Sequence, residues 1–203
     1  NIPGLNSGTI LLLLYLVVGS GMFAGILLTP VAYKKLGYKA TCVIAALTGG
    51  ISLTAAFFLG KINIYFALPF MTIGGIALGS YNVLPYPMVG DSLDYLEWKT
   101  GERMEGVCFS LNSFVTKFNN AVGFIGLSAA LTLFGFVEPS AAGVPSVQSA
   151  STVTGLFSLV TVIPGLGFLL SLIPICFYKF SGIEKEKILS ELAVKRKAVQ
   201  NGV

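Results

Sequence analysis

The sequence predicts an all-α polytopic membrane protein, and its composition and hydropathy carry that prediction. Hydrophobic residues make up 54% of the 203 residues and charged residues only 11%, with a mean hydropathy of +0.82. A soluble domain carries about 25% charged residues, so a soluble fold of this composition would expose a large apolar surface to water. The chain contains no histidine, which removes the usual base of a catalytic triad and a preferred zinc ligand. We therefore expect neither an enzyme nor a metal site.

Five apolar runs are long enough to cross a bilayer, which takes about 20 residues in a helix. They cover residues 9–30, 40–60, 64–89, 107–136 and 153–178. Residues 1–178 are thus predicted to form a transmembrane carboxy-terminal half-bundle, and residues 179–203 a charged tail. In the tail, Ile188, Leu189 and Leu192 form an apolar strip beside several lysines, which predicts an amphipathic cytoplasmic helix. Such a helix can rest on anionic lipid or stay solvated, and the sequence leaves both open.

The basic residues outside these runs fall on alternate connections, which predicts the orientation. Eleven Lys and Arg follow the first, third and fifth runs, whereas Lys61 alone lies on the other side. The positive-inside rule puts the rich side in the cytoplasm, so we expect a multi-pass plasma-membrane protein with its amino terminus outside. Because the charges are split in this way, nucleic acid is not an expected partner. A chain that starts outside without Met or a leader is expected to be a piece of a longer protein that lacks its amino-terminal half.

Lys117 lies in the middle of the fourth apolar run, where a charge is costly. An ionisable side chain at bilayer depth costs from about 3 to over 10 kcal/mol, so one that is retained usually faces a water-filled cavity. Ser110, Ser113 and Asn120 are spaced from it so that all four share one helical face, with Asn112 to one side. This polar stripe predicts the lining of an aqueous pathway. Snorkelling of Lys117, or pairing with a carboxylate that only fixes helix packing, are the alternatives.

Tyr81 and Asn82 are further candidates for substrate binding or coupling. They precede Pro85 and Pro87, and proline removes a backbone donor and tends to kink a helix. A cavity-lining role and a packing kink are both open here. Elsewhere, two glycine pairs at a spacing of four, Gly21 with Gly25 and Gly75 with Gly79, predict close approach of neighbouring helices.

The charged connection at 91–105 is predicted to form a cytoplasmic gate. Asp91, Asp94 and Glu97 recur every three residues and share a face of any helical extension, with Arg103 and Glu105 close behind. Ion pairs in such a connection can form and break as two halves of a transporter rock against each other. A divalent-cation site and a merely solvated helix end are the competing interpretations.

The same stretch resembles a known family. The run DSLDYLEWKTGERMEG at 91–106, followed by SLNSFVTK at 110–117, is similar to the glycoside-pentoside-hexuronide:cation symporters of the major facilitator superfamily, which include melibiose permease. The resemblance implies a major facilitator-type helical bundle in which the five runs correspond to helices 8–12 of a twelve-helix transporter. The seventh helix and the amino-terminal half, which carries the family's cation-binding carboxylates, are then absent from this chain.

The resemblance also implies functional roles. Lys117 matches an eleventh-helix lysine at the sugar and cation sites, and the charged residues at 91–105 match a connection that contributes to the inside gate. Asn82 falls near a family tryptophan, a departure that leaves the substrate open. The implied function is cation-coupled symport of a sugar or glycoside by alternating access, with Na⁺ or H⁺ as coupling ion and no cofactor. A non-transporting five-helix subunit or interaction partner, or a lipid-carrying relative, are the alternatives.

Overall fold

The computed structural model describes residues 7–137, 148–178 and 182–200, which are almost entirely helical. In chain order the helices are α1 (Ser7–Leu36), α2 (Tyr38–Ile62), α3 (Ile64–Val83), α4 (Pro85–Thr100), α5 (Glu105–Leu133), α6 (Ala150–Val160), α7 (Val162–Phe177) and α8 (Ile183–Gln200). No strand occurs among these described residues. Four stretches are long and apolar enough to cross a membrane: Leu12–Leu36, Tyr38–Ile62, Ile64–Thr100 and Ala150–Phe177. The predicted all-α polytopic fold class is therefore confirmed.

Two of the predicted runs are broken helices. The third divides into α3 and α4 at Leu84, directly before Pro85, and the fifth divides into α6 and α7 at Thr161, shortly before Pro164. Proline removes one backbone hydrogen bond and its ring clashes with the preceding turn, which accounts for a break on its amino-terminal side. Pro30, by contrast, does not break its helix. Helix α1 continues through it to Leu36, six residues beyond the predicted end of the first run.

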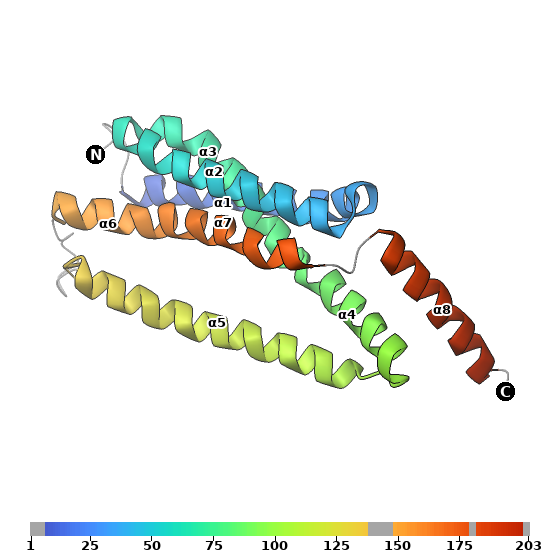
Figure 1. Cartoon of the computed structure of the whole chain (residues 1–203). Coiled ribbons are helices and arrows are strands. Elements are labelled where there is room, and N and C mark those ends of the chain that lie inside the picture. Colours follow the sequence, from blue (N-terminus) through green and yellow to red (C-terminus); the bar gives the residue numbers. More distant parts are fainter. Residues whose placement is uncertain (1–6, 138–147, 179–181, 201–203) are drawn as a thin grey trace.

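Helices α1, α2, α3 and α7 form the packed bundle (Figure 1). The predicted glycine contacts lie between α1 and α3: a Cβ atom on Gly25 would collide with the backbone oxygen of Ile76, and one on Gly79 with that of Met22. The backbones approach this closely only because glycine has no side chain. The close packing predicted from the glycine spacing is confirmed.

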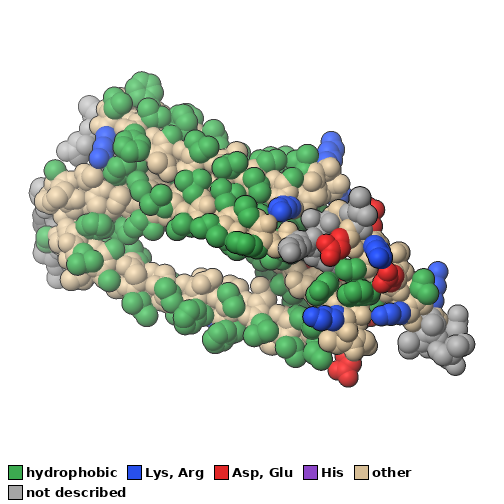
Figure 2. Space-filling view, in the orientation of Figure 1, with side chains coloured by type: hydrophobic (Ala, Val, Ile, Leu, Met, Phe, Trp, Pro, Cys, Tyr) green, Lys and Arg blue, Asp and Glu red, His purple; other side chains and the backbone are tan. Residues whose placement is uncertain are grey.

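Helix α5 stands apart from this bundle along most of its length (Figure 1). At one end it joins α4 through residues 101–104, and at the other Thr152 donates a hydrogen bond of 2.7 Å to the backbone oxygen of Phe134. Figure 2 shows an opening between α5 and the packed helices. The 29 residues of α5 extend over roughly 43 Å, at a rise of 1.5 Å per residue. Helix α5 is thus long enough to cross a membrane, but its polar residues keep it out of the four sufficiently apolar stretches given above. The prediction of five spans therefore stays a prediction.

Helix α8 packs on α4 at the end of the molecule where most charged side chains gather (Figure 2). The apolar strip of the tail faces inward, with Ile188 5% and Leu192 2% exposed. Helix α8 covers Ile183–Gln200 of the tail. Its apolar strip contacts protein, an arrangement that neither alternative for this segment included.

Candidate functional site

The polar stripe lies on the isolated part of α5. All residues from 113 to 129 are exposed, including Lys117, Ser113 and Asn120, and Asn112 is half-buried. Lys117 is the thirteenth of the 29 residues of the helix, so it lies near the middle. No aspartate or glutamate lies within the five apolar runs. The five runs therefore offer Lys117 no carboxylate partner.

Tyr81 is held in the packed bundle. Its hydroxyl lies 2.7 Å from the Ser171 hydroxyl on α7, and its ring meets the Phe168 ring edge-on with centroids 4.9 Å apart. Its neighbour Asn82 is exposed and donates a hydrogen bond of 2.9 Å to the backbone oxygen of Leu78. The structure thus places Tyr81 in a helix contact and Asn82 on the surface of α3, on a different helix from the stripe of α5.

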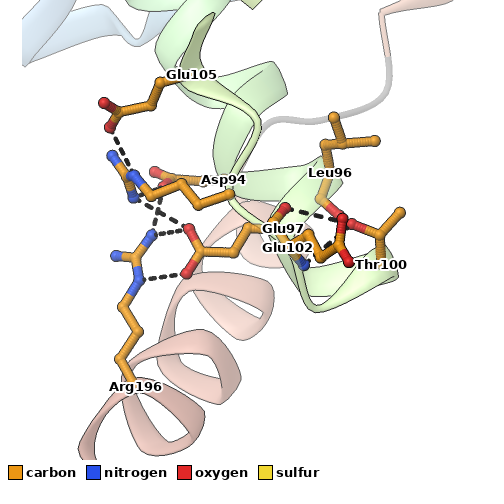
Figure 3. A network of polar contacts seen from close by, with 8 residues as sticks. Asp94, Leu96, Glu97, Thr100, Glu102, Glu105 and Arg196 are labelled. Atoms are coloured by element: carbon orange, nitrogen blue, oxygen red, sulfur yellow. Dashed lines mark hydrogen bonds and ion pairs between the residues drawn. The ribbon is translucent and has the colours of Figure 1, made fainter. Parts of the chain in front are cut away.

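Four charged residues of 91–105 form a network with Arg196 of the tail, which we call the α4–α8 network (Figure 3): Asp94, Glu97, Arg103 and Glu105. Arg196 donates to Glu97 from Nε at 2.8 Å and from Nη2 at 2.5 Å, and to Asp94 at 2.9 Å. Arg103 donates to Glu97 at 3.0 Å and to Glu105 at 2.6 Å. Four of the five predicted gate residues are therefore brought together.

Hydrogen bonding sets the protonation of this network, which lies beyond the predicted membrane-spanning residues 64–89. The hydrogen bonds from Arg196 lower the pKa of the Glu97 carboxyl, against the opposing effect of burial, because they favour its charged form. The carboxylate groups that accept from Arg196 in turn raise the pKa of that guanidinium. Both groups therefore stay charged at neutral pH and form charge-assisted hydrogen bonds.

Asp91, the fifth predicted gate residue, belongs to a separate contact. It is 7% exposed, and Lys185 of α8 donates to its two oxygens at 2.6 and 2.7 Å. Lys185 also donates to the Tyr33 hydroxyl at 3.2 Å, and Tyr178 donates to Asp91 at 3.4 Å. Asp91, Asp94 and Glu97 are thus each paired with a basic residue, and the described part of the chain gathers no group of metal-ligating residues.

Sequence reasoning missed Arg196 and Lys185 as members of these contacts. Both lie in the tail, 99 and 94 residues along the chain from Glu97 and Asp91. The only signal in the sequence is the excess of basic residues in the tail opposite an acidic stretch. That pattern indicates attraction between the two segments, but it does not identify the pairs.

Comparisons with known proteins agree with the fold. A family model described as MFS/sugar transport protein matches residues 5–182. The uncharacterized symporter YjmB of Bacillus subtilis is 30% identical over 94% of this chain and 40% of its own length. The isoprimeverose transporter of Lactiplantibacillus pentosus is 30% identical over 84% of the chain and 34% of its length. The glucuronide carrier protein homolog of Escherichia coli is 27% identical over 95% of the chain and 40% of its length.

The chain spans 40% or less of the length of these three relatives. The relatives are transporters and not enzymes, in agreement with the expectation from the missing histidine. The resemblance to the glycoside-pentoside-hexuronide:cation symporters, drawn from the residues at 91–117, is confirmed by the same matches. A polytopic helical bundle, a family model that covers most of the chain and two relatives at 30% identity lead to one conclusion: the chain belongs to the MFS/sugar transport protein family.

Proposed function

We propose that this chain forms part of a secondary active transporter that couples uptake of a sugar or glycoside to Na⁺ or H⁺ by alternating access. The observation that carries the proposal is the exposed polar stripe of α5, centred on Lys117. The names of two relatives, an isoprimeverose transporter and a glucuronide carrier homolog, support a sugar or glycoside as substrate. No cofactor is required for such transport, because the ion gradient drives it.

The chemistry of Lys117 suits this role. An ammonium group donates up to three hydrogen bonds, so it can bind sugar hydroxyls directly or compete with a cation for a shared carboxylate. Either interaction links occupancy by substrate to occupancy by the ion. The nine acidic residues of the chain all lie outside its apolar runs, so we propose that the carboxylate comes from an amino-terminal half. Ser113, Asn120 and Asn112 would supply further polar contacts along the same helix.

The α4–α8 network is proposed as the cytoplasmic gate. It lies at the end of the molecule where most charged side chains gather, and the positive-inside rule assigns that end to the cytoplasm. Arg103, 44% exposed at its side chain, can exchange partners as the carboxy-terminal helices rock. In this arrangement the amino terminus of the chain lies outside the cell and the tail inside.

Transport by the full-length protein with Lys117→Ala tests the assignment. We expect uptake of a labelled glycoside driven by the ion gradient to be abolished, while the amount of protein in the membrane stays unchanged. Lys61→Ala is the matched control, because it removes the same charge from a connection on the other side and should transport normally. Normal coupled uptake by Lys117→Ala would overturn the proposal.

Counterflow separates the two alternatives. Labelled glycoside exchange in proteoliposomes supports a sugar carrier, and exchange of a labelled lysolipid instead supports a lipid-carrying relative. Exchange of neither substrate, by protein that is correctly inserted, supports a non-transporting membrane subunit.

A further inference from the structure

A basic pocket lies where α1 ends and α2 begins, away from the stripe of α5 and beside the α4–α8 network. Its volume is about 710 Å³, within the range of about 300–1,000 Å³ that holds small ligands. Gly37 alone connects the two helices, with a φ of 80° that only glycine adopts readily. Because this turn is so short, the last residues of α1 and the first of α2 line the same pocket.

The charge of the pocket is positive. Of the described residues that line it, three are lysines, Lys34, Lys39 and Lys185, and one, Asp91, is a carboxylate. Lys185 and Asp91 neutralise each other, since the ammonium contacts both carboxylate oxygens at 2.6 and 2.7 Å. Lys34 is exposed and Lys39 half-buried. Among the described residues, the hydrogen bond that Lys39 makes is a long one, of 3.4 Å to the backbone oxygen of Cys176. Two positive charges therefore remain available to an anion.

The other part of the lining is apolar and faces outward. Leu36, Val43 and Ile44 line the pocket, and Leu36 is 54% and Ile44 48% exposed. Both helices belong to apolar stretches that can cross a membrane, so these side chains lie where such a stretch meets the charged end of the molecule. A ligand that fits must have a negative head next to an apolar body.

From this juxtaposition we propose that the pocket binds the phosphate headgroup of an anionic phospholipid. Lys34 and Lys39 bind the phosphate, and the acyl chains extend along Leu36 and Ile44 into the bilayer. Basic pockets between membrane helices at the cytoplasmic face are suited to such headgroups. The Lys185–Asp91 pair forms the wall next to the headgroup, so a bound lipid would lie against the contact that holds α8 to α4. The proposal does not depend on the identity of the transported solute.

Native mass spectrometry of the full-length protein in detergent tests this site, with phosphatidylglycerol as the anionic probe and phosphatidylcholine as the zwitterionic one. We expect phosphatidylglycerol to bind more tightly than phosphatidylcholine. The double variant Lys34→Gln/Lys39→Gln should weaken phosphatidylglycerol binding roughly 30-fold, because each lysine near an anionic lipid contributes about a factor of five. Lys61→Gln, which removes one charge at the opposite end, should bind as the unchanged protein does.

A competition arm separates a lipid from a soluble anion. Inorganic phosphate at millimolar concentration should not displace phosphatidylglycerol, since it lacks the apolar body. Displacement by phosphate, equal binding of the two lipids, or equal binding by the double variant would each overturn the proposal. If the double variant does not fold, the single variant Lys34→Gln replaces it, because Lys34 is exposed and its removal leaves the Lys185–Asp91 pair intact; it should weaken binding about fivefold.

Discussion

Arg196 on α8 and Glu97 on α4 meet through two parallel hydrogen bonds, of 2.8 Å from Nε and 2.5 Å from Nη2, although 99 residues separate them along the chain. A guanidinium and a carboxylate in this fork geometry bind with more directional preference than two point charges. Helix α4 leads directly through residues 101–104 into α5, which carries Lys117. The tail is thus attached to the segment that connects to the proposed transport helix.

Replacing Arg196 should therefore release the tail. We expect Arg196→Gln to weaken docking of α8 by up to about 1 kcal/mol, the upper range for a partly exposed ion pair, with the Arg196 side chain 41% exposed. Arg196→Lys should have an intermediate effect, because lysine cannot form the two-point contact. Hydrogen exchange of the α8 amides measures the change. Lys197→Gln is the control, since Lys197 is exposed and should leave exchange unaltered.

Docking of α8 should also depend on pH through Glu97. The carboxyl has a pKa below its ordinary value of 4.5 in the folded protein, so its contribution is complete above that value and is lost as the pH falls through the lowered pKa. Spin labels at Thr100 and Lys197, both exposed, should report a distance distribution that is narrow at pH 7 and broadens once the pH has fallen through the lowered pKa of Glu97. Glutamine does not titrate, so in Glu97→Gln the broadening caused by protonation of Glu97 should be absent. A variant whose distance distribution still broadens to the same extent at low pH would contradict the assignment to Glu97.

The fold was largely predictable because hydropathy marks the helices that face lipid. The run predicted at 40–60 corresponds to α2, Tyr38–Ile62, within two residues at each end. The break at Leu84 follows from Pro85, a local rule. Helix α5 is harder to predict. Its polar residues keep it out of the four stretches that are apolar enough to cross a membrane, and its distance from the bundle depends on contacts that no local pattern encodes.

The candidate site was predictable only in part, for a related reason. Asp94, Glu97, Arg103 and Glu105 lie within 12 residues of the chain. Asp94 and Glu97 share a face of α4, and the short connection at 101–104 brings Arg103 and Glu105 next to them. Arg196 comes from a distant segment of the chain, and charge alone does not determine which of the five lysines and one arginine of the tail will pair. Tyr81 is a second case in which local sequence was insufficient. Its position shortly before Pro85 and Pro87 is compatible with a cavity-lining role, whereas its contact with Ser171 could be predicted only from the packing of α7.

The contact between α1 and α3 gives a stability prediction. Gly79→Ala adds a Cβ atom that meets the backbone of Met22, which cannot move aside as a flexible side chain would. Overpacking of this kind costs about 1–3 kcal/mol, so we expect a lower melting temperature in detergent. Gly19→Ala on α1 is the matched control, because nothing lies within 4 Å of the added atom. Alanine favours a helix over glycine, so a loss of stability in Gly19→Ala as large as in Gly79→Ala would contradict the assignment to the close contact.

Water access along α5 tests the polar stripe independently of transport. In a protein freed of native cysteines, Ser113→Cys and Asn120→Cys should react with a membrane-impermeant thiol reagent, because the stripe would line an aqueous pathway. Val122→Cys should react far more slowly. Although Val122 is 51% exposed in the isolated chain, it lies on the opposite side of the helix from Lys117 at about 100° per residue, so lipid or another helix would cover it. Equal labelling at the three positions would mean that water reaches all sides of α5, and that the side bearing Lys117 does not line a specific aqueous pathway. Slower labelling of Ser113→Cys in the presence of glycoside would show that the substrate binds next to the stripe. If Lys117 served only helix packing, no substrate would bind there and the labelling rate would not change.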